Sequence, residues 1–478
     1  MLWPTVSLIA HIVLCVWLVC LLLLRQTGTG DARLAWIVFI VLTPFVGAVA
    51  YLFFGGPRIA GVRRCQHAIV HSHSVKTQIG RPEVVAHMQP EIPPPYDRVF
   101  SLANAISESD TLGGNALQLS RSPQAFVHDF VRDIDAATDT VHLLTYIYLV
   151  DDVGEHIAEA LLRAAARGVA VRLQVDSAGS RAFLKSNLRR DLATGGVHVA
   201  EMLPARLFRL IFARLDLRNH RKIAVIDNEI GWVGSRNIAS PAFAPKARYA
   251  PWVDCMAQLR GPAVRDLQRL FLEDWQVSVG ESHTALLEAP ITEAPGRASC
   301  QVIGTGPNFN NEALTQMLQA CFHAARDELI LTTPYYVPDA ATESALRTAA
   351  MRGVKTTLIV PARNDSHLVS LASRSHYAGL IKAGVEIQEY QAGLLHAKTM
   401  TIDRTLFMLG SANLDRRSLE LNFEVSLFGW CDDFASSLRF LQKSYLNDSR
   451  PVDPDIWLQQ RIPGRLVRNL AGLMSPLL

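Results

Sequence analysis

The sequence has few cysteines and almost no net charge. Seven cysteines are scattered over 478 residues, and no two of them form a C-x-x-C pair. This spacing argues against a disulfide framework and against a zinc site, so reduced structural cysteines are expected. The formal net charge is only +3, which gives no case for binding nucleic acid through charge alone.

Charged residues are also missing from two long apolar runs. Residues 2–24 and 34–54 contain no Asp, Glu, Lys or Arg, and each run could cross roughly 30 Å of hydrocarbon as a helix. The sequence therefore predicts a transmembrane hairpin of two helices over residues 1–57. A cleaved signal peptide followed by a buried helix is the alternative, but the basic n-region is missing. Four Lys or Arg residues between positions 58 and 76, against two in the turn of the hairpin, favour a cytoplasmic catalytic portion.

Two later segments resemble each other and indicate an internal repeat. Residues 136–175 and 324–360 each read as an apolar strand, a helix that ends at Arg-Gly-Val, and a second apolar strand. Short apolar runs that flank a helix are typical of buried parallel strands. The expected fold is α/β, with two units that each contain their own mostly parallel sheet flanked by helices.

The expected division of the chain follows from this repeat. A linker or juxtamembrane segment covers 58–115, the first unit covers 116–285 and the second covers 286–450. The C-terminal segment 451–478 and the stretch 206–218 both mix arginine with bulky apolar residues. Such segments suit a surface that rests on anionic lipid, although an ordinary packing helix with solvated arginines has the same pattern.

Each unit carries the same polar motif. The first has H-R-K-I-A-V-I-D at 220–227 and G-S-R-N at 234–237, and the second has H-A-K-T-M-T-I-D at 396–403 and G-S-A-N at 410–413. One H-x-K-x4-D match could arise by chance. Two copies that each have G-S-x-N at the same offset are not explained by chance. The catalytic set predicted from the motif is His220, Lys222, Asp227, His396, Lys398 and Asp403. Its two aspartates are expected to hold the loop and the lysine rather than to touch substrate.

The spacing within the motif suits phosphate chemistry. In an extended segment, His and Lys two residues apart point to the same face, so both can meet one phosphate. Serine and asparagine of G-S-x-N add donors to phosphate oxygens, and the predicted phosphate-binding residues are Ser235, Asn237, Ser411 and Asn413. Two lysines and these donors can stabilise the charge of five-coordinate phosphorus without a metal. We therefore expect neither a metal nor a cofactor.

Each histidine also needs an acceptor for its second ring nitrogen, which fixes the tautomer. A carboxylate follows each G-S-x-N motif, in W-V-D at 252–254 and in L-N-F-E at 421–424. We expect Glu424 to orient His396 and Asp254 to orient His220. A plain ion pair with a surface arginine is the alternative for Asp254.

The duplicated H-x-K-x4-D with G-S-x-N resembles the phospholipase D superfamily. Residues 216–223 and 410–424, the N-terminal hairpin and the C-terminal L-x-x-L-M-S-P-L-L narrow the resemblance to bacterial cardiolipin synthases of the A type, over nearly the whole chain. The resemblance implies two domains around one active site and a covalent phosphohistidine. It also implies a multi-pass enzyme of the inner membrane that joins two phosphatidylglycerol molecules into cardiolipin and glycerol. It favours His220 as nucleophile and His396 as acid/base.

Three other functions remain open. A phosphodiesterase or nuclease would use the same histidines, although the apolar runs and the low net charge count against it. A phosphatidylserine-forming transferase would take serine and a nucleotide-activated lipid. A non-catalytic membrane scaffold would be free to lose the His, Lys, Ser and Asn that both motif copies retain.

The metal-free mechanism gives a direct test. Because two lysines are expected to take the place of cations, turnover should survive treatment with EDTA. The assay should use neutral detergent micelles, in which divalent ions change lipid packing little. Complete loss of turnover that one divalent ion restores would contradict the expectation.

Overall fold

The computed structural model describes residues 2–24, 30–43, 45–54, 69–74, 88, 90–204, 217–288, 294–307, 312–459 and 462–473. The chain forms two compact units. One comprises residues 1–64 and 205–216, and the other comprises residues 65–204 and 217–478.

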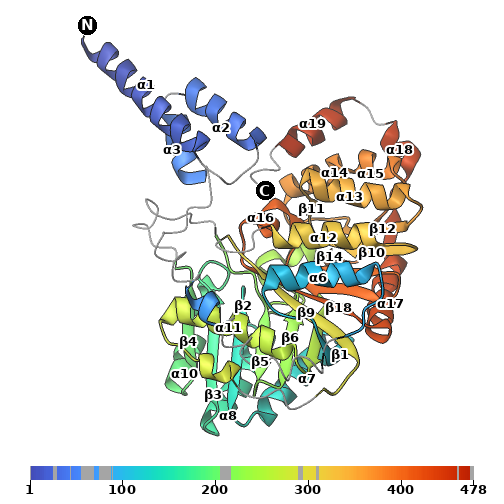
Figure 1. Ribbon diagram of the computed structural model, residues 1–478. Coiled ribbons are helices and arrows are strands. Elements are labelled where there is room, and N and C mark those ends of the chain that lie inside the picture. The colour runs from blue at the N-terminus through green and yellow to red at the C-terminus, as the bar shows by residue number, and fades with distance from the viewer. Residues whose placement is uncertain are drawn as a thin grey trace. The chain divides into compact units, whose positions relative to one another are not determined.

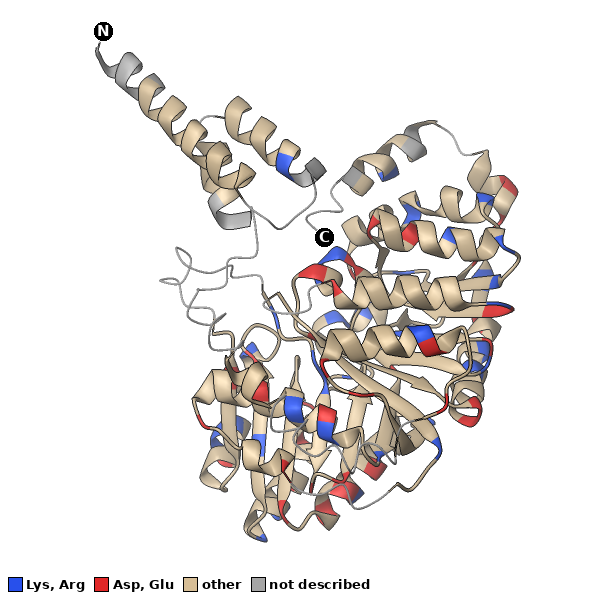
Figure 2. Ribbon diagram, viewed as in Figure 1, with Lys and Arg blue, Asp and Glu red and all other residues tan. Residues whose placement is uncertain are grey.

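The first unit contains three described helices, α1 (Leu2–Leu23), α2 (Gly30–Leu42) and α3 (Val46–Phe54) (Figure 1). The second apolar run therefore forms α2 and α3 rather than one continuous helix. Gly47 allows the two helices to approach, because a Cβ atom there would lie 2.6 Å from the Phe39 carbonyl oxygen. Figure 2 shows α1 to α3 almost free of charged residues. Within the described part of the chain, no helix has both the length and the apolar character to cross a membrane.

The second unit is built around one sheet that contains two copies of the same strand order. In the first copy the order is β4-β3-β2-β5-β6-β8-β1, and in the second it is β13-β12-β10-β15-β16-β18-β9. The first-copy strands are β1 (Leu112–Leu119), β2 (Thr140–Thr145), β3 (Ala170–Asp176), β4 (His198–Met202), β5 (Ile223–Ile226), β6 (Ile230–Gly234) and β8 (Met256–Arg260). The second-copy strands are β9 (Ala298–Thr305), β10 (Glu328–Thr332), β12 (Lys355–Pro361), β13 (Glu386–Tyr390), β15 (Thr399–Ile402), β16 (Leu406–Gly410) and β18 (Glu424–Trp430), with β19 (Ser449–Pro451) at the outer edge. The repeat predicted from the sequence is therefore present in the topology.

Two details of the expected sheets are wrong. Strand β1 pairs with β9, so the two copies share one continuous sheet instead of having one each. Only β2-β3, β3-β4, β10-β12 and β12-β13 are parallel among the described neighbours of this sheet, and the other ten pairs are antiparallel. The physical reason is that parallel neighbours need a crossover helix, whereas β5-β6 and β15-β16 are joined by short turns.

Helices cover both faces of this mixed sheet. The outer helices of the first copy are α7 (Pro123–Ala136), α8 (Asp152–Ala166) and α10 (Asn187–Thr194), and those of the second are α12 (Ala313–Ala324), α13 (Ala340–Met351) and α15 (Tyr377–Lys382). Helices α11 (Val264–Val279) and α17 (Asp432–Asn447) pack on the other face. Ile223 and Val225 join the core with α11, while Ala224 and Ile226 join the core with α7 and α8. Because both faces of these strands are buried, their sequences are apolar runs without alternation.

The remaining elements are short. They are helices α9 (Arg181–Leu184), α14 (His367–Ser375), α16 (Arg416–Glu420), α18 (Pro454–Leu458) and α19 (Ile462–Leu473), the 3₁₀ turns η2 (Ala244–Tyr249) and η3 (Thr284–Leu287), and the strand pairs β7 (Trp252–Val253) with β14 (Leu394–Leu395) and β11 (Tyr336–Val337) with β17 (Leu414–Asp415).

The segments that flank the two copies differ in their structure. Although a linker is expected over 58–115, its part α6 (Tyr96–Ser107) packs into the core of the second copy. In the C-terminal segment, α19 leaves Ile462, Leu466, Val467 and Leu470 exposed and buries Ala471. The amphipathic C-terminal segment expected from the sequence stays a prediction. The arginine-rich stretch 206–218 lies outside the described residues apart from its last two positions.

Candidate active site

The two motif copies lie at equivalent places in the repeat. His220 and Lys222 come just before β5, and His396 and Lys398 come just before β15. Since β5 runs antiparallel to β2, and β15 to β10, these residues sit beside the carboxyl ends of β2 and β10. Each G-S-x-N motif begins at the last residue of the next strand, Gly234 or Gly410. A Cβ atom at Gly410 would lie 2.3 Å from the Val425 carbonyl oxygen, so the close pairing of β16 and β18 requires glycine.

Each histidine is oriented by a carboxylate from the other copy of the repeat. His220 Nδ1 lies 3.1 Å from Glu424 Oε1, and His396 Nδ1 lies 2.6 Å from Asp254 Oδ1. The expected pairing, Glu424 with His396 and Asp254 with His220, is therefore wrong, although both carboxylates contact a motif histidine. The two ion pairs bring both copies into a single site.

The backbone explains why the partners are exchanged. The His220 N–H donates to the carbonyl oxygen of Phe423 at 2.8 Å, and the His396 N–H donates to that of Val253 at 2.7 Å. Each of these carbonyl groups belongs to the residue before the orienting carboxylate. The parallel pair β7-β14 and the bridge between Asn219 and Phe423 fix this register. Main-chain pairing between the copies thus sets which carboxylate each imidazole meets.

The hydroxyl groups of the two motif serines donate to the orienting carboxylates, so they are not available to donate to a phosphate. Ser235 Oγ donates to Asp254 Oδ1 at 2.7 Å, and Ser411 Oγ donates to Glu424 Oε2 at 2.5 Å. A hydroxyl group has one proton to donate, so in this arrangement it is committed to the carboxylate. Each copy therefore supplies a Ser–carboxylate pair that orients the histidine of the other copy.

The motif asparagines and aspartates hold loops. Asn237 Oδ1 accepts the Ile147 N–H at 3.2 Å, and the Asn413 amide hydrogen-bonds to the Asp415 carboxyl group. Asp227 accepts the N–H groups of residues 138–140 at 2.8 Å each. Asp403 does the same for residues 326–328 at 2.7–2.9 Å. These contacts hold loops, as expected, but the expectation that the two aspartates also hold the motif lysines is wrong.

Neither aspartate lies beside a histidine. A strand of four buried residues, β5 or β15, separates each aspartate from its Lys, and four residues of strand span about 13 Å. The lysine ammonium groups instead donate to the backbone, Lys222 Nζ to His220 O at 2.6 Å and Lys398 Nζ to His396 O at 2.5 Å. Asp227 and Asp403 are thus motif residues at the far end of the strand.

Burial dominates the electrostatics of the site. It lowers the pKa of Lys222 to about 8 and that of Lys398 to about 7, although Asp254 and Glu424 act in the opposite direction. Burial and then Lys398 lower the pKa of His396 to about 4 against the pull of Asp254. The His396 imidazole is therefore neutral at pH 7.

The two orienting carboxylates stay ionised. Burial would raise the pKa of Glu424, but His220, Lys222 and Ser411 outweigh it and the pKa lies below its ordinary value. Burial would likewise raise the pKa of Asp254, but the contact with His396 and the nearby Arg236 and Lys398 cations hold it well below the ordinary range. His396 Nδ1 is hydrogen-bonded to Asp254, and His220 Nδ1 faces both Glu424 and the Asn422 amide, which lies 3.2 Å away. In each imidazole this leaves Nε2 as the nitrogen available for chemistry.

Two aromatic residues in the site were missed from the sequence. Tyr146 packs on His220 with ring centroids 4.2 Å apart, and its ring centroid lies 5.5 Å from Lys222 Nζ. Trp252 packs on His396 at 4.8 Å. Trp252 could have been found, because it precedes Asp254 by two residues in an extended segment and so shares its face. Within the described residues, no group of three His, Cys, Asp or Glu side chains is suited to hold a metal.

Comparisons with known proteins agree with this geometry. A family model described as "Cardiolipin synthase, PLD-like domain" matches residues 130–275 and 318–440, and one described as "Phospholipase_D-nuclease N-terminal" matches residues 13–56. The chain is 36% identical to Cardiolipin synthase A of Proteus mirabilis (strain HI4320), over 94% of this chain and 93% of that protein. It is 35% identical to Cardiolipin synthase A of Edwardsiella ictaluri (strain 93-146), over 96% of each chain.

A solved structure shares the fold. The crystal structure of phosphatidylserine synthase from Haemophilus influenzae Rd KW20 aligns with a TM-score of 0.57 and 12% sequence identity. The alignment covers 76% of this chain and 95% of that chain. The shared architecture of the two copies therefore extends to proteins of very different sequence.

The buried lysines predict an alkaline limit to activity. If each lysine acts as a cation, which it is below its pKa, kcat/KM should fall as the pH rises through about 7 to 8. A bound phosphodiester anion stabilises both ammonium groups, so kcat should fall only at higher pH. Initial rates at several lipid concentrations give both profiles. A kcat/KM that stays flat between about pH 7 and pH 9 would contradict the prediction.

Proposed function

The chain belongs to the cardiolipin synthase A family of phospholipase D-like enzymes, and on that premise we propose that it joins two phosphatidylglycerol molecules into cardiolipin and glycerol. It is a phosphatidyltransferase of phospholipid biosynthesis. The observation that carries the proposed mechanism is the crossed pair of contacts, His220 with Glu424 and His396 with Asp254. Two imidazoles with their Nδ1 atoms committed to carboxylates suit a reaction that needs one nucleophile and one proton carrier.

We propose the following steps. His220 Nε2 attacks the phosphorus of the first phosphatidylglycerol, and the P–O bond to the headgroup glycerol breaks as the P–N bond forms. His396 gives its Nε2 proton to the leaving glycerol oxygen. The headgroup hydroxyl of the second phosphatidylglycerol then attacks phosphorus, breaks the P–N bond and gives its proton back to His396. The net reaction consumes no water and no cofactor.

His396 has to take up its Nε2 proton from solvent when the substrate binds. Burial lowers the pKa of His396 to about 4, so its imidazole is neutral at pH 7 before the lipid is bound. The bound lipid adds a negative phosphate, which favours the imidazolium form of a neighbouring histidine. Lys222 and Lys398 balance the further charge that develops on the equatorial oxygens. The charge state required for general acid catalysis is thus produced by lipid binding.

Motif residues with other contacts receive supporting roles. Asn237 and Asn413 are buried, and we propose that their amide N–H groups reach phosphate oxygens once lipid is bound. We propose that Ser235 and Ser411 act mainly through the carboxylates to which they donate. Asp227 and Asp403 keep the turns after β5 and β15 in place.

We propose that residues 1–57 anchor the enzyme in the bacterial inner membrane as a multi-pass segment, with the catalytic part on the cytoplasmic side. The absence of charged residues from 2–24 and 34–54 supports this proposal. The exposed apolar side chains of α19 add a second surface suited to anionic lipid. The partners are phosphatidylglycerol and anionic membrane lipid, and no nucleic acid is involved.

Purified lipids supplied one at a time test the function. Phosphatidylglycerol alone should yield cardiolipin and free glycerol in equal amounts. Since the bonds broken and formed are both phosphodiesters of primary alcohols, excess glycerol should convert cardiolipin back to phosphatidylglycerol. His220→Ala and His396→Ala serve as inactive controls. Release of phosphatidic acid would indicate a hydrolase, and a strict need for a nucleotide-activated lipid and serine would indicate the phosphatidylserine-forming reaction.

The assignment of the two histidines has its own test. The full-length enzyme is quenched during turnover on lipid with a radiolabelled phosphate, and the acid-labile phosphoramidate is mapped to a peptide. We expect the label on His220, with none in the His220→Ala variant. Label on His396 and none on His220 would reverse the two roles while leaving the overall reaction unchanged.

A further inference from the structure

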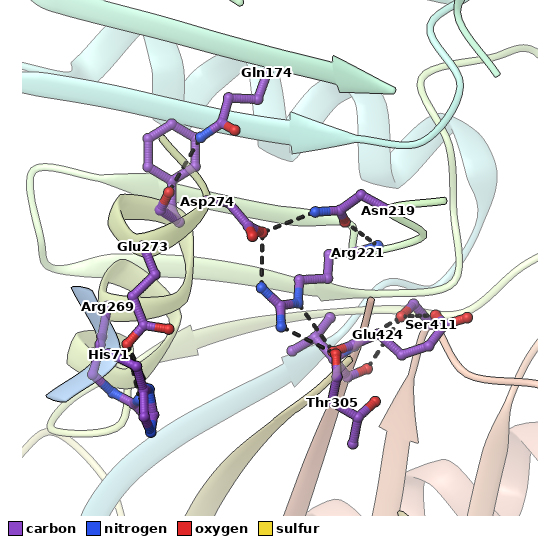
Figure 3. A network of polar contacts seen from close by, with 12 residues as sticks. His71, Gln174, Asn219, Arg221, Arg269, Glu273, Asp274, Thr305, Ser411 and Glu424 are labelled. Atoms are coloured by element: carbon purple, nitrogen blue, oxygen red, sulfur yellow. Dashed lines mark hydrogen bonds and ion pairs between the residues drawn. The ribbon is translucent and has the colours of Figure 1, made fainter. Parts of the chain in front are cut away.

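The residue between the catalytic His and Lys differs in the two motif copies. It is Arg221 in the first copy and Ala397 in the second, and both are fully buried. A buried guanidinium is costly unless its donors are satisfied, so its contacts are informative. Figure 3 shows Arg221 at the centre of a network that reaches Glu424.

Arg221 binds both copies of the repeat at once. In the first copy, its Nη1 donates to Asp274 Oδ2 on α11 at 2.8 Å. In the second copy, Nε donates to the Glu424 carbonyl oxygen and Nη2 to the Thr305 carbonyl oxygen, each at 3.1 Å. Glu424 and Thr305 are directly opposite each other in the β9-β18 ladder. The guanidinium therefore holds the start of β18, where the carboxylate partner of His220 is attached.

Asp274 holds both Arg221 and Asn219, two residues earlier in the chain. Its Oδ2 also accepts the Asn219 side-chain N–H at 2.9 Å, and Asn219 Oδ1 accepts the Arg221 backbone N–H at 3.0 Å. Asp274 is 2% exposed, so these contacts, rather than water, balance its negative charge. Residues on both sides of His220 are thus tied to one carboxylate on α11.

The surrounding packing leaves little freedom for the guanidinium. A Cβ atom at Gly304 would lie 3.2 Å from Arg221 Nη2. The guanidinium carbon also lies 5.6 Å from the ring centroid of Phe423. Arginine fits this place because its planar group donates in three directions at fixed angles, which lysine does not do.

We propose that Arg221, held by Asp274, is a positioning residue that fixes the Glu424 carboxylate on His220 Nδ1. The second copy has Ala397 at the equivalent position, so this arginine positions His220 and has no counterpart next to His396. This inference rests on the proposed function for its kinetic consequence, but the orientation of His220 can be measured without any lipid. An ordinary fold-stabilising ion pair is the competing explanation.

The chain offers a matched control for that explanation. Arg269 and Glu273 form another buried ion pair on the same helix α11, with Arg269 Nη1 3.3 Å from Glu273 Oε1 and each side chain 2% exposed. Figure 3 shows that Glu273 is joined to His71. Loss of this pair removes a similar buried contact from the same helix without touching His220 or Glu424.

The experiment compares Arg221→Met, Asp274→Asn and the double variant with Arg269→Met and Glu273→Gln in the full-length enzyme. Kinetics on phosphatidylglycerol give kcat and KM, and thermal unfolding gives stability. NMR of ¹⁵N-histidine-labelled enzyme without lipid reports the Nδ1 protons of His220 and His396, assigned with the two His→Ala variants. The double variant leaves no unpaired buried charge and so favours a folded protein.

We expect Arg221→Met and Asp274→Asn to shift or broaden the His220 Nδ1 proton and to leave that of His396 in place. The kcat should fall by about 100-fold, as for a misplacement near 1 Å, with KM changed much less. The double variant should recover stability but not kcat. The control variants should lose stability and keep kcat and both proton signals.

An unchanged His220 signal in folded Asp274→Asn or in the double variant would overturn the proposal, and so would an equal loss of kcat in the Arg269 and Glu273 variants. If Arg221→Met does not fold, Asp274→Asn and the double variant decide the question. The NMR result stands apart from the proposed function. If the parent enzyme forms a different product, the kinetic arm is measured on that reaction and the His220 signal still decides whether Arg221 positions it.

Discussion

The active site depends on main-chain pairing between the two copies of the repeat. Each motif histidine donates its backbone N–H to the carbonyl group just before a carboxylate of the other copy, and its imidazole then meets that carboxylate. The proposed catalytic unit is therefore a crossed pair of contacts, and each copy supplies only half of it. A shift of one residue in either contact would turn the carboxylate to the opposite face of its strand and leave an imidazole without its partner.

The sheet provides the rigidity that this crossed arrangement needs. Strands β1 and β9 join the two copies into one layer, and α11 and α17 share a core with strands from both copies. Interiors of this kind are close-packed and deform little, so the two halves are held at a fixed separation. Arg221 adds a polar connection at the same boundary, from α11 to the ladder of β9 and β18.

Burial gives the site its chemical character as well as its shape. The same exclusion of water that lowers the pKa of Lys222, Lys398 and His396 also strengthens their interaction with a phosphate anion. The Asp254 and Glu424 carboxylates stay ionised because they are paired with histidine and serine. We propose that an anionic phosphate in the site favours the charged forms of these groups, which would couple lipid binding to readiness for catalysis.

The sequence alone determined the repeat, the motif residues and the chemistry they suit. The apolar runs, the Gly after each crossover helix and the two H-x-K-x4-D copies are local patterns, and local spacing is enough to reveal them. The family resemblance that rests on these residues is confirmed by relatives that are 35–36% identical over nearly the whole chain.

The tertiary structure decided everything that depends on contacts between the copies. It exchanged the partners of His220 and His396, turned Ser235 and Ser411 toward carboxylates, and placed Asp227 and Asp403 at the far end of their strands. It also made one mixed sheet from two expected ones. Glu424 is 204 positions from His220, and Asp254 is 142 positions from His396. Sequence periodicity describes the faces of single elements and carries no information on which distant element meets a given face, so only the folded chain specifies these partners.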